Sequence, residues 1–371
     1  MDRLQKQLDN LASQKTIKQA IMAVESGDQS FCWSGAAGET SQGGMRVSTD
    51  MPFFIASIDK LYNAVIVFLL SEQDKLNLND PISAYLPSYL TRGFHTLNGT
   101  DYSGKLTVRH LLSHTSGLAD WLEDAPKYGQ SLAQQVLKQG DRALTFEEIA
   151  EVVRGLKPHF LPQDFSSSRV KVRYSDTNFI LIIALIEAVC GLPLHQVHAD
   201  MLYTPLGLRH TYFPGFSQPL DPTPAPVPLR ADGRVIEIPG LIASFRGINS
   251  TAGDTIAFLR KLARNEVFQK EETFACMQAN WNRFNFPMDH AALRSPGWPI
   301  EYGLGLMRFQ LPRIFTSLKL LPTVIGHTGS TGCWLFWCPK MDMFFSGTVN
   351  EVSAGAVPYR VVPKVLRILL D

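Results

Sequence analysis

Strand-like segments lie at both ends of this 371-residue chain, and helical patterns fill its middle. Residues 16–55 hold alternating and glycine-broken segments. Late in the chain, the apolar runs 334–337 and 343–345 flank a short turn, which predicts a β-hairpin. The stretch 72–240 shows helical patterns that proline and glycine interrupt. This arrangement favours one sheet assembled from both ends of the chain, with a helical insertion between them.

The length and the apolar content allow a large core. With 45% hydrophobic residues, 371 residues suggest about two domains, or one large core with an insertion. We predict an α/β (α+β) fold whose antiparallel sheet, flanked by helices, comes from residues 1–75 and 241–371, while residues 76–240 form a mostly helical domain. The functional site is expected in the cleft between the two. Helices are predicted at residues 3–15, 57–70, 177–190, 251–263 and 356–371.

The charge and the cysteines exclude several classes of protein. Lys+Arg 35 against Asp+Glu 34 leaves a net charge of +1, and no basic patch of the kind that binds nucleic acid occurs. The cysteines are odd in number and scattered, and no two form a CxxC pair, so neither a disulfide framework nor a zinc site is expected. They are Cys32, Cys190, Cys276, Cys333 and Cys338.

The longest apolar runs, 64–70 and 179–190, are too short to span a bilayer. The polar segment 1–6 lacks the apolar core of a signal peptide. We therefore expect a soluble protein in the cytoplasm, or in the periplasm or outside the cell if a leader has been removed.

A serine stands three residues before a lysine at the start of the apolar run 57–70. Residues i and i+3 share one helical face, so the Lys60 amine can lie beside the Ser57 hydroxyl. A serine is a weak nucleophile at its free pKa, and an adjacent amine, kept neutral by burial and nearby positive charge, can take its proton. The pair indicates acyl transfer, although by itself it also fits an N-cap serine followed by a solvated lysine.

Two further segments support the acyl-transfer interpretation. Tyr174-Ser175-Asp176 directly precedes the apolar helix 177–190, and Gly326-His327-Thr328-Gly329-Ser330 directly precedes the aromatic strand. In this order, SxxK, YxD and HTG resemble the three motifs of the serine β-lactamase and penicillin-binding-protein superfamily. The resemblance is strongest to its class C β-lactamase-like branch, which includes D,D-peptidases and family VIII carboxylesterases. It extends over residues 10–365 through four further landmarks, at 74–81, 110–118, 204–208 and 302–305.

The resemblance implies a role for each motif residue. Ser57 would be the acylated nucleophile, and Lys60, in its neutral form, would be its general base or a proton relay. Tyr174 would exchange protons with Ser57 and the leaving group, for which its phenol would need a pKa lowered by neighbouring cations. The backbone N–H groups of Ser57 and Ser330 would form the oxyanion hole. The alternative for Tyr174 is a half-buried packing aromatic.

Asp176 departs from the pattern of the branch, which usually has asparagine at this position. A carboxylate beside Lys60 and Tyr174 would favour a charged lysine and raise the pKa of the tyrosine, so the identity of the base stays open. Asp176 could contact substrate, but it would also make a good N-cap for the helix 177–190.

His327 stands where many β-lactamases have a lysine that holds a permanent charge for the substrate carboxylate. An unperturbed imidazole, with a pKa near 6.5, is mostly neutral at pH 7.5. We therefore expect weaker selection for carboxylate-bearing substrates and a preference for neutral esters. The alternative is a histidine held by backbone contacts at the start of a strand.

The remaining candidates are less specific. The HTG motif places Thr328 and Gly329 beside substrate, Trp121 is a candidate pocket wall or a packing residue, and Asn350 is a candidate substrate contact at the end of the last strand. His110 and His114 have a metal-clip spacing, but HLLSH is not the zincin motif, and no metal is expected.

Together these features predict a serine hydrolase that forms an acyl-enzyme, most simply a carboxylesterase acting on short acyl esters, with no cofactor. The alternatives are a β-lactamase or a D-Ala-D-Ala carboxypeptidase or D-aminopeptidase, and a catalytically silent binding protein on the same fold. The partners would be a small ester, a β-lactam or a D-peptide. The oligomeric state is not indicated by the sequence.

Overall fold

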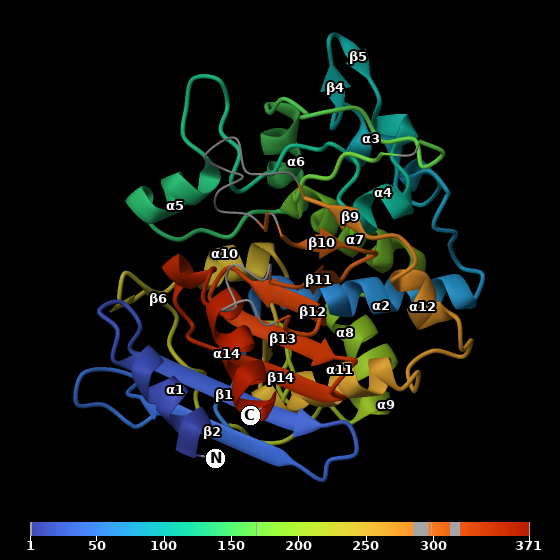
Figure 1. Cartoon of the computed structure of the whole chain (residues 1–371). Helices are drawn as coiled ribbons and strands as arrows, with labels where there is room; N and C mark the ends of the chain where they lie inside the picture. The colour runs from blue at the N-terminus through green and yellow to red at the C-terminus, as the bar shows by residue number, and fades with distance from the viewer. Residues whose placement is uncertain (1, 168, 285–295, 298, 312–319, 371) are drawn as a thin grey trace.

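The sheet is built from both ends of the chain. The computed structural model describes residues 2–167, 169–284, 296–297, 299–311 and 320–370. Within these residues one antiparallel sheet has eight strands in the order β2-β1-β14-β13-β12-β11-β10-β9 (Figure 1). They are β1 (Gln19–Ser26), β2 (Cys32–Gly38), β9 (Asn282–Arg283), β10 (Glu301–Tyr302), β11 (Met307–Phe309), β12 (Val324–Gly329), β13 (Cys333–Cys338) and β14 (Met343–Thr348).

Pairing between the first and the last strand joins the two ends of the chain. β1 lies antiparallel to β14, with Ile21 opposite Thr348 and Ser26 opposite Met343. β13 and β14 form the hairpin that the sequence predicts. The sequence-based expectation of a sheet assembled from both chain ends is therefore confirmed.

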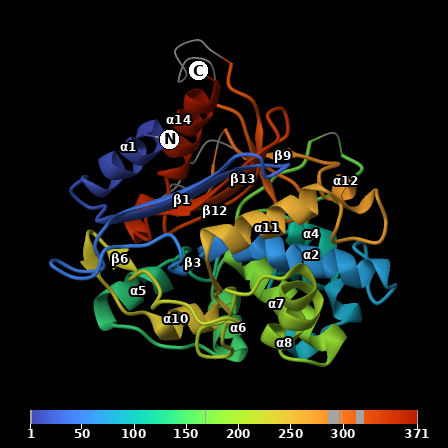
Figure 2. The ribbon, with the colours of Figure 1, turned by 90° about the horizontal axis from the view of Figure 1, so that it is seen from below.

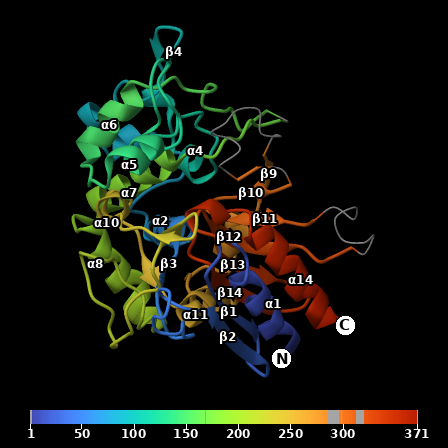
Figure 3. The same ribbon diagram turned by 90° about the vertical axis from the view of Figure 1, so that its left-hand side faces the viewer.

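Helices cover both faces of the sheet, as Figures 2 and 3 show. On one face lie α1 (Asp2–Ala12) and α14 (Pro358–Leu370); on the other lie α11 (Ala252–Ala263) and, behind it, α2 (Asp59–Glu72). Successive residues of a strand point to opposite faces. In β13, Trp334 therefore joins the apolar cluster under α1 and α14, while Leu335 joins the cluster on the other side.

Between α2 and α11 most of the regular structure is helical, and long loops join the helices. The main helices there are α3 (Ser88–Thr91), α4 (Val108–Leu112), α5 (Leu132–Gln139), α6 (Phe146–Arg154), α7 (Asp176–Cys190), α8 (Leu194–His198), α9 (Thr204–Leu206) and α10 (Pro239–Ser244), and α12 (Thr273–Met277) follows α11. The other short strands pair as β3 (Phe53–Phe54) with β8 (Asn249–Ser250), β4 (Thr96–Leu97) with β5 (Thr100–Asp101), and β6 (Arg230–Ala231) with β7 (Arg234–Val235). In the predicted helical domain, α7 packs against both α4 and α2, and α2 belongs to the other predicted domain. These contacts do not show where one domain ends and the other begins, so the boundaries at residues 76 and 241 stay a prediction.

Several local predictions can be compared with the structure. Thr251 caps α11 by accepting a hydrogen bond from the backbone N–H of Asp254 at 3.2 Å, as expected for a capping residue. All five cysteines are free. In the part of the chain that the structure describes, no single helix is long and apolar enough to cross a membrane. Among the described helices, one bent pair, Asp176–Cys190 and Leu194–Leu206, reaches that length and composition together.

Two close contacts fix α2 against the sheet. Ala56–Ile58 forms a short 3-10 turn that leads directly into α2 and lies against the end of β12. A Cβ added at Gly329 would lie 2.8 Å from the Cβ of Ala56. β12 pairs with β11 only as far as Gly326, so the following residues pair with β13 alone. The end of β12 is thus an open edge beside the turn that carries Ser57.

Gly305 makes the second close approach, on the other side of α2. Its φ is +83°, and a Cβ there would lie 2.1 Å from the Cβ of Ala64. A positive φ favours glycine, and the contact leaves no room for a side chain. Gly305 thus lets the turn after β10 approach α2 closely at Ala64.

We predict that Gly305→Ala lowers the free energy of unfolding by about 3 kcal/mol, because it adds overpacking to backbone strain. Urea denaturation measures this. The matched control is Gly207→Ala, where φ is +67° but no atom lies within 4 Å of the added Cβ. There only the strain remains, at about 1 kcal/mol. An equal loss in both variants would mean that α2 moves aside without cost.

Candidate active site

Ser57 and Lys60 lie side by side, as the i, i+3 spacing predicts. The Lys60 Nζ is 3.1 Å from the Ser57 Oγ, within hydrogen-bond distance. The helix itself begins two residues later than expected, because Ser57 belongs to the 3-10 turn and α2 starts at Asp59. Lys60 is buried, whereas Ser57 is partly exposed. The alternative of a solvated lysine is therefore wrong.

Two carboxylates flank the Lys60 ammonium group. Its Nζ lies 2.7 Å from Asp176 Oδ1 and 3.8 Å from Asp59 Oδ1. Burial by itself lowers the pKa of Lys60, but the charges of Asp176 and then Asp59 outweigh it and hold that pKa above its usual value. Lys60 is thus charged at rest. This corrects the neutral lysine that the motif implied, and it agrees with the effect expected of an aspartate at position 176.

Tyr174 is buried beside Lys60, with the lysine Nζ 5.5 Å from the centre of its ring. Burial, and then the charge of Asp176, raises the pKa of Tyr174 well above its ordinary value. The lowering that the motif role requires is therefore absent, and the direction agrees with the rise expected of an aspartate at position 176. The phenol keeps its proton at rest and can act as a proton donor.

His114 is a site residue whose position the sequence did not reveal. Its ring stacks on Tyr174 with centroids 4.3 Å apart, and its Nδ1 accepts a hydrogen bond from the backbone N–H of Ser175 at 3.2 Å. Burial, and then the charge of Lys60, lowers the pKa of His114 well below the usual value. Its φ of +55° is uncommon for a residue with a side chain and reflects the turn after α4. Sequence patterns do not reveal this backbone conformation, so the place of His114 in the site could not be predicted from them.

Asp176 does not cap α7. Ser175 is the N-cap residue, and its hydroxyl donates to the Ala119 carbonyl at 3.1 Å. The backbone N–H of Asp176 donates to Asp120 Oδ2 at 2.8 Å. Burial, and then the charge of Asp176, raises the pKa of Asp120 to about 8. The Asp176 carboxylate is left free to turn toward Lys60, so the N-cap interpretation is wrong.

His327 is buried at the open end of β12, with no exposed surface. Its Nδ1 lies 2.7 Å from the Thr328 carbonyl and its Nε2 lies 3.0 Å from the Tyr302 hydroxyl. Because a carbonyl only accepts, Nδ1 carries the proton and Nε2 accepts from Tyr302. Burial, and then the charge of Lys60, lowers the pKa of His327 to about 3. The imidazole is therefore neutral at physiological pH.

In the rest of the HTG motif, the position of the backbone matters more than the side chains. Thr328 Oγ1 lies 3.0 Å from the Tyr359 hydroxyl on α14 and is buried there. Gly329 fits against Ala56, as described above. The exposed Ser330 follows Gly329 directly, which brings its backbone to the turn that carries Ser57.

Trp121 and Asn350 have packing contacts. The Trp121 ring is fully buried, with its centroid 4.7 Å from that of Phe245. Asn350 is also fully buried, and its Nδ2 donates to the Val227 carbonyl in the proline-rich loop at 2.8 Å. With no exposed surface, neither side chain is available as a pocket wall in this state.

The two histidines with metal-clip spacing have other partners. His110 Nε2 lies 2.7 Å from the Gln163 carbonyl and its Nδ1 lies 2.8 Å from the Thr107 hydroxyl, while His114 binds the backbone of Ser175. Among the described residues, no group of three or more His, Cys, Asp and Glu is placed to hold a metal ion.

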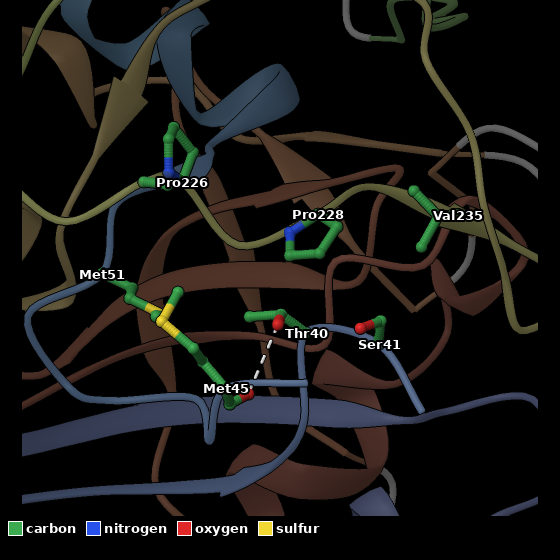
Figure 4. Close-up of a pocket in the computed structure, with 8 residues that line it drawn as sticks. Thr40, Ser41, Met45, Met51, Pro226, Pro228 and Val235 are labelled. Carbon is green, nitrogen blue, oxygen red and sulfur yellow. Dashed lines mark hydrogen bonds between the residues drawn. The ribbon is translucent and has the colours of Figure 1, made fainter. Parts of the chain in front are cut away.

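A separate apolar cavity of about 330 Å³ lies between the loop after β2 and the proline-rich loop (Figure 4). None of the residues around Ser57 lines it. Its walls are Thr40, Ser41, Met45, Met51, Ala225, Pro226, Pro228 and Val235.

We predict that neutral His327 makes the fold sensitive to acid. Its pKa of about 3 in the folded state lies below the value of 6.5 in the unfolded chain. The folded state therefore binds fewer protons between these values, and stability falls as the pH drops from 6.5 toward 3. The loss from this group is at most about 1.4 kcal/mol per pH unit.

Urea unfolding between pH 4 and pH 7 tests this. His327→Gln should flatten the pH dependence relative to the wild type. The same change at the half-buried His195 on α8 is the control and should leave the slope as it is. A His327→Gln slope equal to that of the wild type would contradict the prediction.

Known proteins resemble this chain in sequence and in fold. Penicillin-binding protein 4* of Bacillus subtilis is 25% identical over 210 residues, which make up 56% of this chain but only 40% of that protein. The chain thus spans less than half the length of the curated relatives it matches.

Solved structures extend the comparison over the whole fold. The D-stereospecific amidohydrolase from a Streptomyces species has a TM-score of 0.72 at 24% identity, covering 97% of both chains. EstCE1, described as a hydrolase with promiscuous acyltransferase activity, has a TM-score of 0.71 at 20% identity, covering 98% of this chain and 97% of its own. A family model described as Beta-lactamase matches residues 5–360. Because that match includes nearly the whole chain and the motifs that meet at Ser57, this protein belongs to the Beta-lactamase family.

Proposed function

We propose that this protein is a serine hydrolase that forms an acyl-enzyme on Ser57 and prefers short, uncharged acyl esters. The observation that carries the proposal is the 3.1 Å contact between Ser57 Oγ and the buried Lys60 Nζ, with Tyr174 beside the lysine. A partly exposed hydroxyl held against a buried amine is the arrangement that nucleophilic catalysis requires.

The residues support a two-step reaction. Ser57 Oγ attacks the ester carbonyl and gives up its proton toward Lys60, and the backbone N–H groups of Ser57 and Ser330 receive the oxyanion. The alkoxide then leaves and takes a proton. The phenol of Tyr174 is a suitable donor, because its raised pKa keeps it protonated. Water repeats the attack on the acyl-enzyme and releases the acid.

The preference for uncharged substrates rests on His327 and Lys60. His327 is neutral and both its ring nitrogens have partners, so it offers no positive charge to a substrate carboxylate. The charge of Lys60 is already paired with Asp176. The carboxylate of a β-lactam or a D-peptide would therefore find no free positive charge at either residue. Since these relatives act on different substrates, amide and peptide hydrolysis are the alternatives to test.

A silent scaffold is a poorer explanation. Burying a lysine and two carboxylates costs desolvation free energy, and apolar residues of similar size often stabilise a fold as well or better. A protein without chemistry at Ser57 gains nothing evident from this cluster.

We predict that the wild type hydrolyses p-nitrophenyl butyrate much faster than nitrocefin, D-phenylalanine amide or a D-alanyl-D-alanine peptide. Because the pKa of His327 is far below 7, the ratio of ester to nitrocefin turnover should not change between pH 6 and pH 9. Ser57→Ala should abolish both hydrolysis and labelling by a fluorophosphonate. Ser71→Ala, at the other end of α2, is the matched control and should behave as the wild type.

Other outcomes point elsewhere. Dominant nitrocefin or D-peptide turnover that depends on Ser57 would replace the ester preference with the corresponding alternative. If no substrate is turned over and Ser57 takes no label, the hydrolase proposal is wrong and the scaffold explanation stands.

A further inference from the structure

A charged Lys60 raises a question about the first chemical step. An ammonium group cannot take the Ser57 proton unless it gives up one of its own. The phenol of Tyr174 is protonated and cannot accept that proton at rest. His327 has both nitrogens engaged, and the Nδ1 of His114 already accepts from Ser175. A different group has to receive the proton.

The two carboxylates beside Lys60 are placed differently. Asp176 Oδ1 is in direct contact with Lys60 Nζ at 2.7 Å, from the first turn of α7. Asp59 Oδ1 is 3.8 Å away on α2 itself. Only Asp176 is close enough to exchange a proton with the amine directly.

We propose that Asp176 is the proton acceptor behind Lys60, so that the Ser57 proton is relayed through the lysine to a carboxylate. This rests on the proposed function. As Oγ bonds to the carbonyl carbon, the Ser57 O–H bond breaks and its proton moves to Lys60 Nζ. One Nζ–H bond breaks at the same time, and that proton moves to Asp176 Oδ1.

The relay conserves charge in the buried cluster. Lys60 is an ammonium group before and after the step, Asp176 changes from carboxylate to carboxylic acid, and the negative charge appears on the substrate oxyanion. When the leaving alkoxide departs with the Tyr174 proton, the proton held by Asp176 returns through Lys60 to the phenolate, which restores the resting site. Asp59 acts as a positioning residue, because its charge favours the ammonium form without contacting it directly.

Position 176 distinguishes this chain from the branch it resembles. An asparagine there can orient a lysine but cannot take its proton. An aspartate can do both. The substitution therefore changes which group in the site ends up holding the proton.

The titratable groups that face Lys60 come from every element packed around it. They are Asp59 on α2, Asp176 on α7 with Asp120 behind it, Tyr174 before α7, His114 after α4, Tyr302 on β10 and His327 on β12. Burial raises the pKa of Asp59 to about 7, so a second carboxyl in the cluster titrates close to neutral pH. Any pH profile of the site therefore includes a contribution from Asp59.

The test is the pH dependence of kcat for p-nitrophenyl butyrate in the wild type, Asp176→Asn and Asp59→Asn. If the relay operates, Asp176→Asn should lose at least tenfold in kcat at pH 7. The acidic limb of its profile, where kcat falls as the pH drops, should also move at least one pH unit upward, because Lys60 must then lose its proton to solvent. Asp59→Asn removes a carboxylate that is not in direct contact with Lys60. This variant should leave the acidic limb in place or move it downward.

The opposite result is expected if Asp176 serves only to hold Lys60 charged, because its removal then frees the lysine as a base. Asp176→Asn would then be as active as the wild type or more active at pH 7, with a limb moved downward as in Asp59→Asn. That outcome overturns the relay.

Two measurements separate the relay from other failures. Asp176→Asn should regain most of the wild-type rate of fluorophosphonate labelling at pH 9.5. If it stays unlabelled there although its circular dichroism is that of the wild type, the damage is not protonic and the relay is wrong. A wild type without turnover or label overturns the proposed function itself, whereas an active wild type with an unshifted Asp176→Asn limb overturns the relay alone.

Discussion

The site depends on one buried ammonium group held between two carboxylates. Lys60 connects Ser57, in the turn before α2, to Asp176 on α7. Together with burial, which is the larger cause, its charge lowers the pKa of both His114 and His327. The charge of Lys60 thus links the protonation states of side chains from four separate parts of the chain. Losing the lysine would leave the buried Asp59 and the partly buried Asp176 without their cation, and uncompensated buried charge is strongly destabilising.

The fold supplies the rigidity that this cluster needs. α2 is buried almost all round, with the sheet side on one face and α7 on the other, so Lys60 has no freedom to move toward solvent. Gly305 and Gly329 bring backbone against the start of this helix where a side chain would not fit. Close packing thus fixes the positions of Ser57 and Lys60, and the charges around them then determine which atoms hold protons.

Much of this could be predicted from the sequence, and the failures have physical reasons. Alternating patterns and turn residues indicated the sheet from both chain ends and the hairpin, and i, i+3 spacing placed Lys60 beside Ser57. The motif role required a lowered pKa for Tyr174, whereas burial and then the charge of Asp176 raise it, in the direction that an aspartate at position 176 already indicated. Trp121 gave no signal of its burial under Phe245, and His114 lies 60 residues before Tyr174 in sequence. Such contacts are set by tertiary packing, which local patterns do not contain.

The pairing of β1 with β14 has a consequence for how the protein is made. About 300 residues separate these strands, and the turn carrying Ser57 packs against β12 from the same late region. At about 5–20 residues per second, a ribosome needs at least about 15 s to deliver the partners of the first strands. During that time β1, β2 and the apolar helix α2 are exposed without a sheet to join. Newly made chains of this protein should therefore rely on chaperones that shield hydrophobic segments until synthesis ends.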